Sequence, residues 1–153
     1  MKKILIATDG SETSRAALEA GFELAEEEGA EVVVAHVASL LDFVPHRNGG
    51  ADAPPDRFPT SDWDPVLCEA MELAERRGVK ARPELLVGYP PKQILRLASE
   101  LEADLIVVGS RGLGRVKSAI LGSTSRDVLA RAGRPVLVVR DSAEHAAVTD
   151  RAS

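Results

Sequence analysis

Five short aliphatic runs, spread over almost the whole chain, limit most strongly what this sequence can fold into. They occupy residues 3–8, 31–37, 81–87, 105–108 and 135–139. Several of them are apolar throughout and rich in β-branched residues, as at positions 32–34, 105–108 and 136–139. Strands that are apolar on both faces are typical of a parallel sheet with helices on each side, so we predict five parallel strands.

Amphipathic stretches with a helical period separate these runs. The first has Ser11 or Thr13 as its expected N-cap and Gly29 as its C-terminal stop. The second covers about residues 64–77, the third starts at the two prolines 90–91, and the fourth covers about residues 123–132. The side chains expected on the inner faces of the first, third and fourth helices are Ala17, Leu18, Gly21, Leu24, Ala25, Ile94, Leu97, Ala98, Leu101, Ser125, Val128, Leu129 and Ala132.

Strands that alternate with helices through right-handed crossovers give an α/β fold with a doubly wound, five-stranded parallel sheet. The expected strand order is 3-2-1-4-5, which makes the first and fourth strands neighbours at the topological switch point. Ligands of such sheets bind beyond the carboxyl ends of these two strands. We therefore look for a site at residues 7–10 and from Gly109 onward.

The length of 153 residues suits a single domain, which we expect to span residues 1–140. Residues 40–62 are rich in proline and glycine and lack periodicity, which predicts a long mobile loop. Residues 141–153 are small and polar, which predicts a disordered tail.

Composition excludes several classes of function. The formal net charge of −5 argues against duplex binding, and aromatic residues at 3% leave no stacking platform for single strands, so no nucleic-acid partner is expected. The single cysteine, Cys68, forms no intramolecular disulfide, and beside Leu67 and Met71 we expect it to be buried. No targeting signal or bilayer-spanning run is present in the sequence, so we expect a cytoplasmic protein without a membrane partner.

Two familiar phosphate-binding motifs fail in the glycine-rich segment after the fourth run. A Walker A loop requires lysine after Gly114, where Arg115 stands. A dinucleotide fingerprint requires a third glycine at the position of Lys117 and follows the first strand of its fold.

The physical requirements for anion binding are nevertheless met. Glycines at 109, 112 and 114 let the backbone turn tightly and approach an anion. Residues 122–125 (Gly-Ser-Thr-Ser) bring N–H groups and hydroxyls to a helix N-terminus, where the helix dipole favours negative charge. Any one of these residues has a simple structural role as a turn or a cap, but together at the switch point they favour a phosphate site.

The spacing Gly109-x2-Gly112-x9-Gly122-Ser123 resembles the nucleotide-binding signature of universal stress proteins. The resemblance extends to the opening residues 4–11, to His36 and Val37, to residues 103–109 and to residues 134–139, and so covers almost the whole chain. It implies an adenine nucleotide alpha hydrolase-like fold. The intact glycine pattern is similar to that of the ATP-binding branch of the family.

Carried over residue by residue, the resemblance implies a site for ATP. It assigns Asp9 to the ribose, the Val37 backbone to the adenine edge, and Ala7 and Thr8 to the lining of the adenosine pocket. Around the ribose and phosphates it assigns Gly109, Arg111, Gly112, Gly122, Ser123, Thr124 and Ser125. Mg²⁺ is expected to be held mainly through the phosphates, in keeping with its preference for phosphate and water oxygens.

The resemblance also implies a homodimer paired through the last strand, Val136–Val139, whose apolar edge is a liability unless it is covered. Asp9 remains open to two compatible roles, as a ligand contact and as a cap of the following helix. His36 is expected to be a core or strand-end residue. No two histidines have metal-ligand spacing.

Three functions from different classes remain. The first is an ATP-binding, dimeric regulator or sensor of the stress response. The second is a slow ATPase or related nucleotide hydrolase, although no carboxylate within residues 109–125 is available as a base. The third is a nucleotide-free interaction module, against which the intact glycine spacing argues. A flavin carrier is weaker still, because aromatic residues that could sandwich the ring are scarce.

Overall fold

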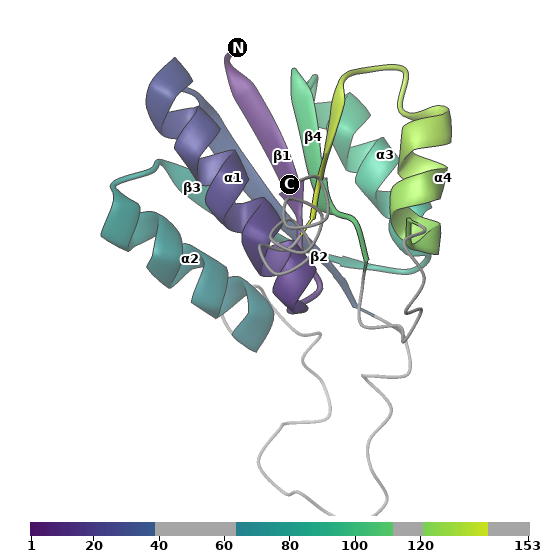
Figure 1. Cartoon of the computed structure of the whole chain (residues 1–153), viewed down its shortest axis with the longest axis horizontal. Helices are drawn as coiled ribbons and strands as arrows, with labels where there is room; N and C mark the ends of the chain where they lie inside the picture. Colours follow the sequence, from purple (N-terminus) through teal and green to yellow (C-terminus); the bar gives the residue numbers. More distant parts are fainter. Residues whose placement is uncertain (39–63, 112–120, 141–153) are drawn as a thin grey trace, which may run out of the picture.

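The computed structural model describes residues 1–38, 64–111 and 121–140, and within them the strands form one five-stranded parallel sheet (Figure 1). The strands are β1 (Lys3–Ala7), β2 (Glu31–Ala38), β3 (Ala81–Val87), β4 (Leu105–Gly109) and β5 (Val136–Val139). Their order is β3-β2-β1-β4-β5, with every neighbouring pair parallel. The predicted fold class and strand order are confirmed. The expected loop at 40–62 and tail at 141–153 lie outside the described residues.

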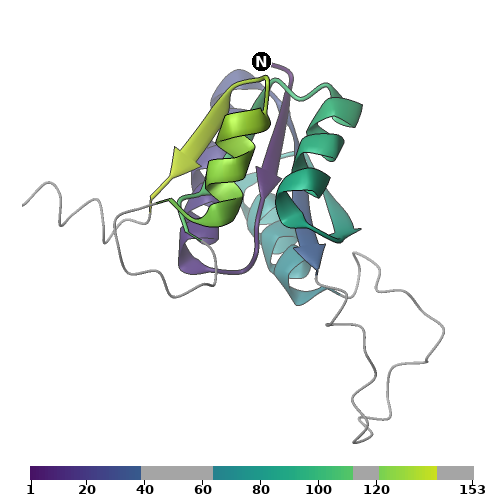
Figure 2. The ribbon, with the colours of Figure 1, turned by 90° about the vertical axis from the view of Figure 1, so that its right-hand side faces the viewer.

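Helices cover both faces of the sheet, as the apolar strands require. Alternate residues of the central strands face opposite sides. Ile4, Ile6 and Val34 pack with α1 (Glu12–Glu28) and α2 (Pro65–Arg77). Leu5, Val33 and Val108 pack with α3 (Pro90–Leu101) and α4 (Ser123–Arg131), the two helices nearest the viewer in Figure 2. Of the helices described, none has both the length and the apolarity needed to cross a membrane.

Local signals set the helix ends. Ser11 is the N-cap of α1, as expected, since its Oγ accepts the Ser14 N–H at 3.2 Å. Gly29 and Gly78 end α1 and α2 in the left-handed conformation, with φ of 66° and 68°. Asp64 precedes α2, but its carboxylate contacts His36 Nδ1 at 2.6 Å and does not cap the helix. His36 therefore links the end of β2 to the start of α2.

Two predictions of burial were wrong. Cys68 is exposed, and Leu129 is 42% exposed to solvent. Both residues directly follow a fully buried one, Leu67 and Val128. Consecutive helical residues point about 100° apart, so an apolar neighbour in sequence does not share the buried face.

Asp104 ties the segment before β4 to the start of β1. Its Oδ2 accepts the backbone N–H groups of Lys2 at 2.8 Å and Lys3 at 2.9 Å. These hydrogen bonds, that from Lys2 first, hold the pKa of Asp104 below its ordinary value. Because the folded pKa is lowered, the carboxylate stabilises the fold above its unfolded pKa, and this contribution is lost as pH falls through the folded pKa.

Asp104→Asn is accordingly expected to be less stable than wild type at neutral pH and to approach it in acid. The amide keeps the shape but carries no charge toward the two N–H groups. Urea unfolding of both proteins at about pH 7 and about pH 2 measures the difference. A stability gap of the same size at both pH values would show that the charge of Asp104 has no part in it.

Candidate functional site

A pocket lies at the carboxyl ends of β1, β2 and β4, where the strand order reverses. It holds about 550 Å³ of empty space, part of it open to solvent. The strands and the turns that follow them contribute part of the lining, including Asp9 and Arg111, and α1, α3 and α4 contribute residues from their N-terminal turns. The lining residues are Ala7, Thr8, Asp9, Ser14, Val37, Pro90, Ile94, Val108, Gly109, Arg111, Thr124 and Ser125.

Most of the residues predicted from sequence come together here. Those that line the pocket are Ala7, Thr8, Asp9, Val37, Gly109, Arg111, Thr124 and Ser125. Gly122 and Ser123 directly precede Thr124 and Ser125 at the start of α4 but are not part of the lining. Gly112 lies outside the described residues. Sequence reasoning missed Ser14, Pro90, Ile94 and Val108.

At the end of β1, hydroxyl groups hold the turn into α1. Thr8 Oγ1 donates to Ser14 Oγ at 3.0 Å, and Ser14 Oγ donates to the Ser11 carbonyl at 2.9 Å. The carboxylate of Asp9 accepts the Ser11 N–H at 2.9 Å and so shapes the turn, while Ser11 itself caps the helix. The structure therefore gives Asp9 a turn-forming role at a position that also lines the pocket.

At the end of β4, the chain passes directly beneath the first turn of α1. A Cβ placed on Gly109 would lie 2.8 Å from the Thr13 carbonyl carbon and oxygen and 2.9 Å from the Ser14 nitrogen. Ser125 donates its hydroxyl to the Gly109 carbonyl. Glycine at 109 is therefore needed for helix packing, which is a different reason from the open approach to an anion inferred from the sequence.

The helix N-termini at the pocket differ in how many N–H groups they leave for a ligand. The first turn of α1 is capped by its own Ser11. Pro90 and Pro91 open α3 and carry no N–H. Helix α4 begins after Gly122, which has no side chain to cap it. Of these helices, α4 is the one whose N-terminal N–H groups and dipole best suit an anion.

The opposite end of the pocket is apolar. Val37, on β2, and Ile94 belong to one apolar cluster with Ala7, and β1 separates β2 from β4. Thr8 N donates to the Ala35 carbonyl at 2.9 Å, so Ala35 directs its backbone groups toward β1. These directions alternate along a strand, so Val37 directs its N–H and C=O to the same edge of β2 as Ala35 does. At Val37 that edge lies just beyond the end of β1 at Ala7.

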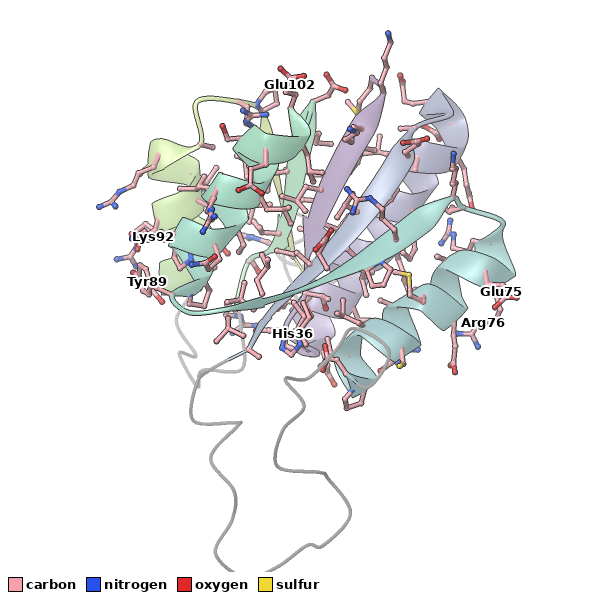
Figure 3. The ribbon with its side chains drawn as sticks, turned by 180° about the vertical axis from the view of Figure 1, so that it is seen from behind. His36, Glu75, Arg76, Tyr89, Lys92 and Glu102 are labelled. Atoms are coloured by element: carbon pink, nitrogen blue, oxygen red, sulfur yellow. The ribbon has the colours of Figure 1, made fainter. Side chains whose placement is uncertain are left out.

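Tyr89 and Asp127 bridge α3 and α4 beside the pocket. The Tyr89 hydroxyl donates to Asp127 Oδ2 at 2.8 Å, and this hydrogen bond to a carboxylate raises the pKa of Tyr89. Tyr89 is 58% exposed and lies with Lys92 at the start of α3 (Figure 3). The bridge joins Asp127, in the second turn of α4, to the residue that precedes Pro90.

Among the residues that the structure describes, no three histidine, cysteine, aspartate or glutamate side chains are grouped so that they could hold a metal ion.

The fold and this pocket define a doubly wound α/β protein with a pocket at the topological switch point, the place where such sheets bind ligands. A model described as "Universal stress protein family" matches residues 1–140. The chain is 34% identical over 139 residues to the universal stress protein MJ0531 of Methanocaldococcus jannaschii, covering 91% of this chain and 82% of that protein. It is 36% identical over 145 residues to YxiE of Bacillus subtilis, covering 90% and 98%. The chain belongs to the universal stress protein family.

Solved structures agree. MJ0577 of Methanocaldococcus jannaschii superposes with a TM-score of 0.74 at 26% identity, covering 92% of this chain and 96% of that one. A universal stress protein in complex with cAMP gives 0.69 at 26% identity, covering 92% and 98%. A universal stress protein from Archaeoglobus fulgidus in complex with dAMP gives 0.64 at 26% identity, covering 91% and 98%.

Proposed function

We propose that this protein is a cytoplasmic, dimeric regulator or sensor of the stress response. In this proposal it binds ATP, with Mg²⁺ held through the phosphates, in the pocket at the carboxyl ends of β1 and β4. The observation that carries the proposal is the polarity of the pocket. The part beside β2 is apolar with outward-facing backbone groups at Val37, and the part beside β4 meets the N-terminus of α4, which no side chain of the described residues caps.

The apolar end fits an adenine ring. Val37 and Ile94 offer surface for the faces of the base. The Val37 N–H and C=O together form a donor and acceptor pair that suits the edge of adenine, which itself carries one acceptor and one donor side by side. Asp9 lies between this end and Arg111, where its carboxylate would accept hydrogen bonds from ribose hydroxyls.

The polar end fits phosphate. Arg111 is one of its lining residues, and a guanidinium can donate to phosphate oxygens from a fixed fork. Thr124 contributes a hydroxyl, and the N–H groups that follow Gly122 belong to the open first turn of α4. Relatives were solved with cAMP and dAMP, both of which carry an adenine and a phosphate, the two groups that these ends suit.

The site supports binding better than catalysis. Rapid hydrolysis requires a group that positions water and a metal held at the terminal phosphate. Within the described residues the pocket lining contains one carboxylate, that of Asp9, and in this proposal it meets the ribose and not the terminal phosphate. We therefore assign ATP a structural role, in which occupancy favours one conformation or the dimer.

Isothermal titration of the nucleotide-stripped protein with ATP and Mg²⁺ tests the proposal, with GTP and AMP as controls. We expect micromolar binding of ATP, about −8 kcal/mol, and weaker binding of GTP. Turnover of bound ATP, followed in the same samples, would identify an ATPase instead. Absence of heat with every nucleotide, in protein shown to be folded, would favour an interaction module that needs no nucleotide.

The two edges of the sheet differ in a way that supports pairing through β5. Edge strand β3 carries Arg82, Pro83 and Glu84, which discourage strand addition. Edge strand β5 consists of Val and Leu alone, all of them half-buried. An apolar edge of this kind is suited to a second copy of the chain, which would cover it with its own β5.

Val138→Pro is expected to weaken this dimer and leave the monomer folded. Within the monomer, the Pro135 carbonyl accepts the backbone N–H of Ile106 in β4 at 3.0 Å. The Val139 carbonyl accepts the backbone N–H of Ser110, which directly follows β4, at 2.8 Å. By alternation, Val138 directs its N–H to the open edge, where proline removes a donor that β4 does not use. Sedimentation velocity measures the change. Val138→Thr, which keeps the N–H, is the control, and equal dimerisation of both variants would place the interface elsewhere.

A further inference from the structure

The first turn of α1 contacts the ends of both strands that frame the pocket. Toward β1, Ser14 Oγ accepts the hydroxyl of Thr8 at 3.0 Å and the N–H of Asp9 at 3.4 Å. Toward β4, Thr13 Oγ1 donates to the carbonyl oxygen of Arg111, with Ser11 Oγ 3.5 Å from the same oxygen. One helical turn therefore connects Asp9 with Arg111.

Thr13 holds the β4 side of this connection in two ways. Its main chain packs so closely on Gly109 that no Cβ fits between them. Its hydroxyl donates a hydrogen bond to the carbonyl of Arg111, which lies two residues after Gly109 in the chain. Thr13 is 5% exposed and is absent from the pocket lining. Thr13 is therefore placed to affect a ligand indirectly, through Arg111, which does line the pocket.

We propose that Thr13 is a positioning residue for the phosphate end of the site. Its hydroxyl fixes the backbone of Arg111 relative to Asp9 and so sets the distance between the group that meets the ribose and the group that meets the phosphates. This inference rests on the proposed function, since it concerns the affinity of the same pocket for ATP. Ser14 belongs to the same turn, but it lines the pocket itself, so Thr13 gives the cleaner test.

The experiment compares ATP with adenosine, which has no phosphate. Thr13→Val keeps the shape of the side chain and removes the hydroxyl. We expect it to weaken ATP binding about tenfold, the effect of losing one hydrogen bond that orders the site, and to change adenosine affinity less than about twofold. Thr13→Ser retains the donor and is expected to bind ATP within about threefold of wild type. Titration calorimetry gives the affinities, and urea unfolding confirms that each variant is folded.

The outcomes separate this inference from the function on which it rests. Wild-type protein that binds neither ATP nor adenosine overturns the proposed function and this inference with it. If Thr13→Val binds ATP as tightly as the wild type does, the pocket still holds ATP and only the role of Thr13 is overturned. Wild-type protein that binds ATP and adenosine equally well overturns the phosphate end of the proposed site, and the role of Thr13 with it. Equal losses for ATP and adenosine would mean that Thr13 supports the fold alone. If Thr13→Val does not fold, Thr13→Ala, which leaves a smaller apolar residue, is judged by the same ratio of affinities.

Discussion

Gly109→Ala is expected to lower the free energy of unfolding by about 2–3 kcal/mol, although it adds only one methyl group. The new Cβ would lie 2.8 Å from backbone atoms of Thr13 and 2.9 Å from the Ser14 nitrogen. A flexible side chain could move away from such a contact, but the backbone of a helix cannot yield alone. Relief therefore requires α1 to shift away from β4.

A shift of α1 also affects the site, because Ser14 lines the pocket and Thr13 bonds the Arg111 carbonyl. We therefore expect ATP binding to weaken in the fraction of Gly109→Ala that remains folded. Urea unfolding followed by circular dichroism gives the stability, and calorimetry gives the affinity.

Gly133→Ala is the matched control for this prediction. Gly133 has no heavy atom within 4 Å of its added Cβ, but its φ is 59°. Its substitution is expected to cost about 1–2 kcal/mol through backbone conformation alone and to leave ATP affinity unchanged. Stability of Gly109→Ala equal to that of wild type would show that α1 and β4 adjust to the methyl group without strain.

At Gly109 the sequence predicted the position of the residue but not the reason for glycine there. The glycine spacing located this residue at the pocket correctly, because glycine after a buried strand marks a close approach of some kind. It could not say what approaches. The approaching group is the first turn of α1, about a hundred residues away in sequence, and its position depends on how the helix packs across the sheet.

The pocket residues that the sequence did not predict on α3 were missed for the same reason, because their position depends on how a helix packs on the sheet. The ends of the strands were predictable, since alternating strands and helices fix the switch point, and Ala7, Val37 and Gly109 lie at or near those ends. Pro90 and Ile94 come from α3, which covers the strand ends from one face. The sequence indicated that Ile94 is buried, but a buried helical position can face a core or a ligand pocket equally well.

Gly122→Val is expected to reduce ATP affinity about hundredfold or more while the protein remains folded. Gly122 has φ of −60° and ψ of 159°, a conformation that valine adopts readily, so the backbone needs no rearrangement. As the N-cap of α4, valine is less suitable than glycine, which is expected to cost about 1 kcal/mol of stability. The larger effect is on binding, because a branched Cβ stands where the open first turn of α4 would meet a phosphate.

Adenosine distinguishes this effect from general damage. It lacks the phosphates, so its affinity for Gly122→Val should stay close to that of wild type, whereas Gly109→Ala disturbs both ends of the pocket by moving α1. Gly122→Ala, with one carbon in place of three, is expected to lie between wild type and valine for ATP. Two glycines of one spacing motif would then have separable roles, one in helix packing and one in ligand access. Unchanged ATP affinity in Gly122→Val would remove the phosphates from the N-terminus of α4, and with them the polarity on which the assignment of the pocket depends.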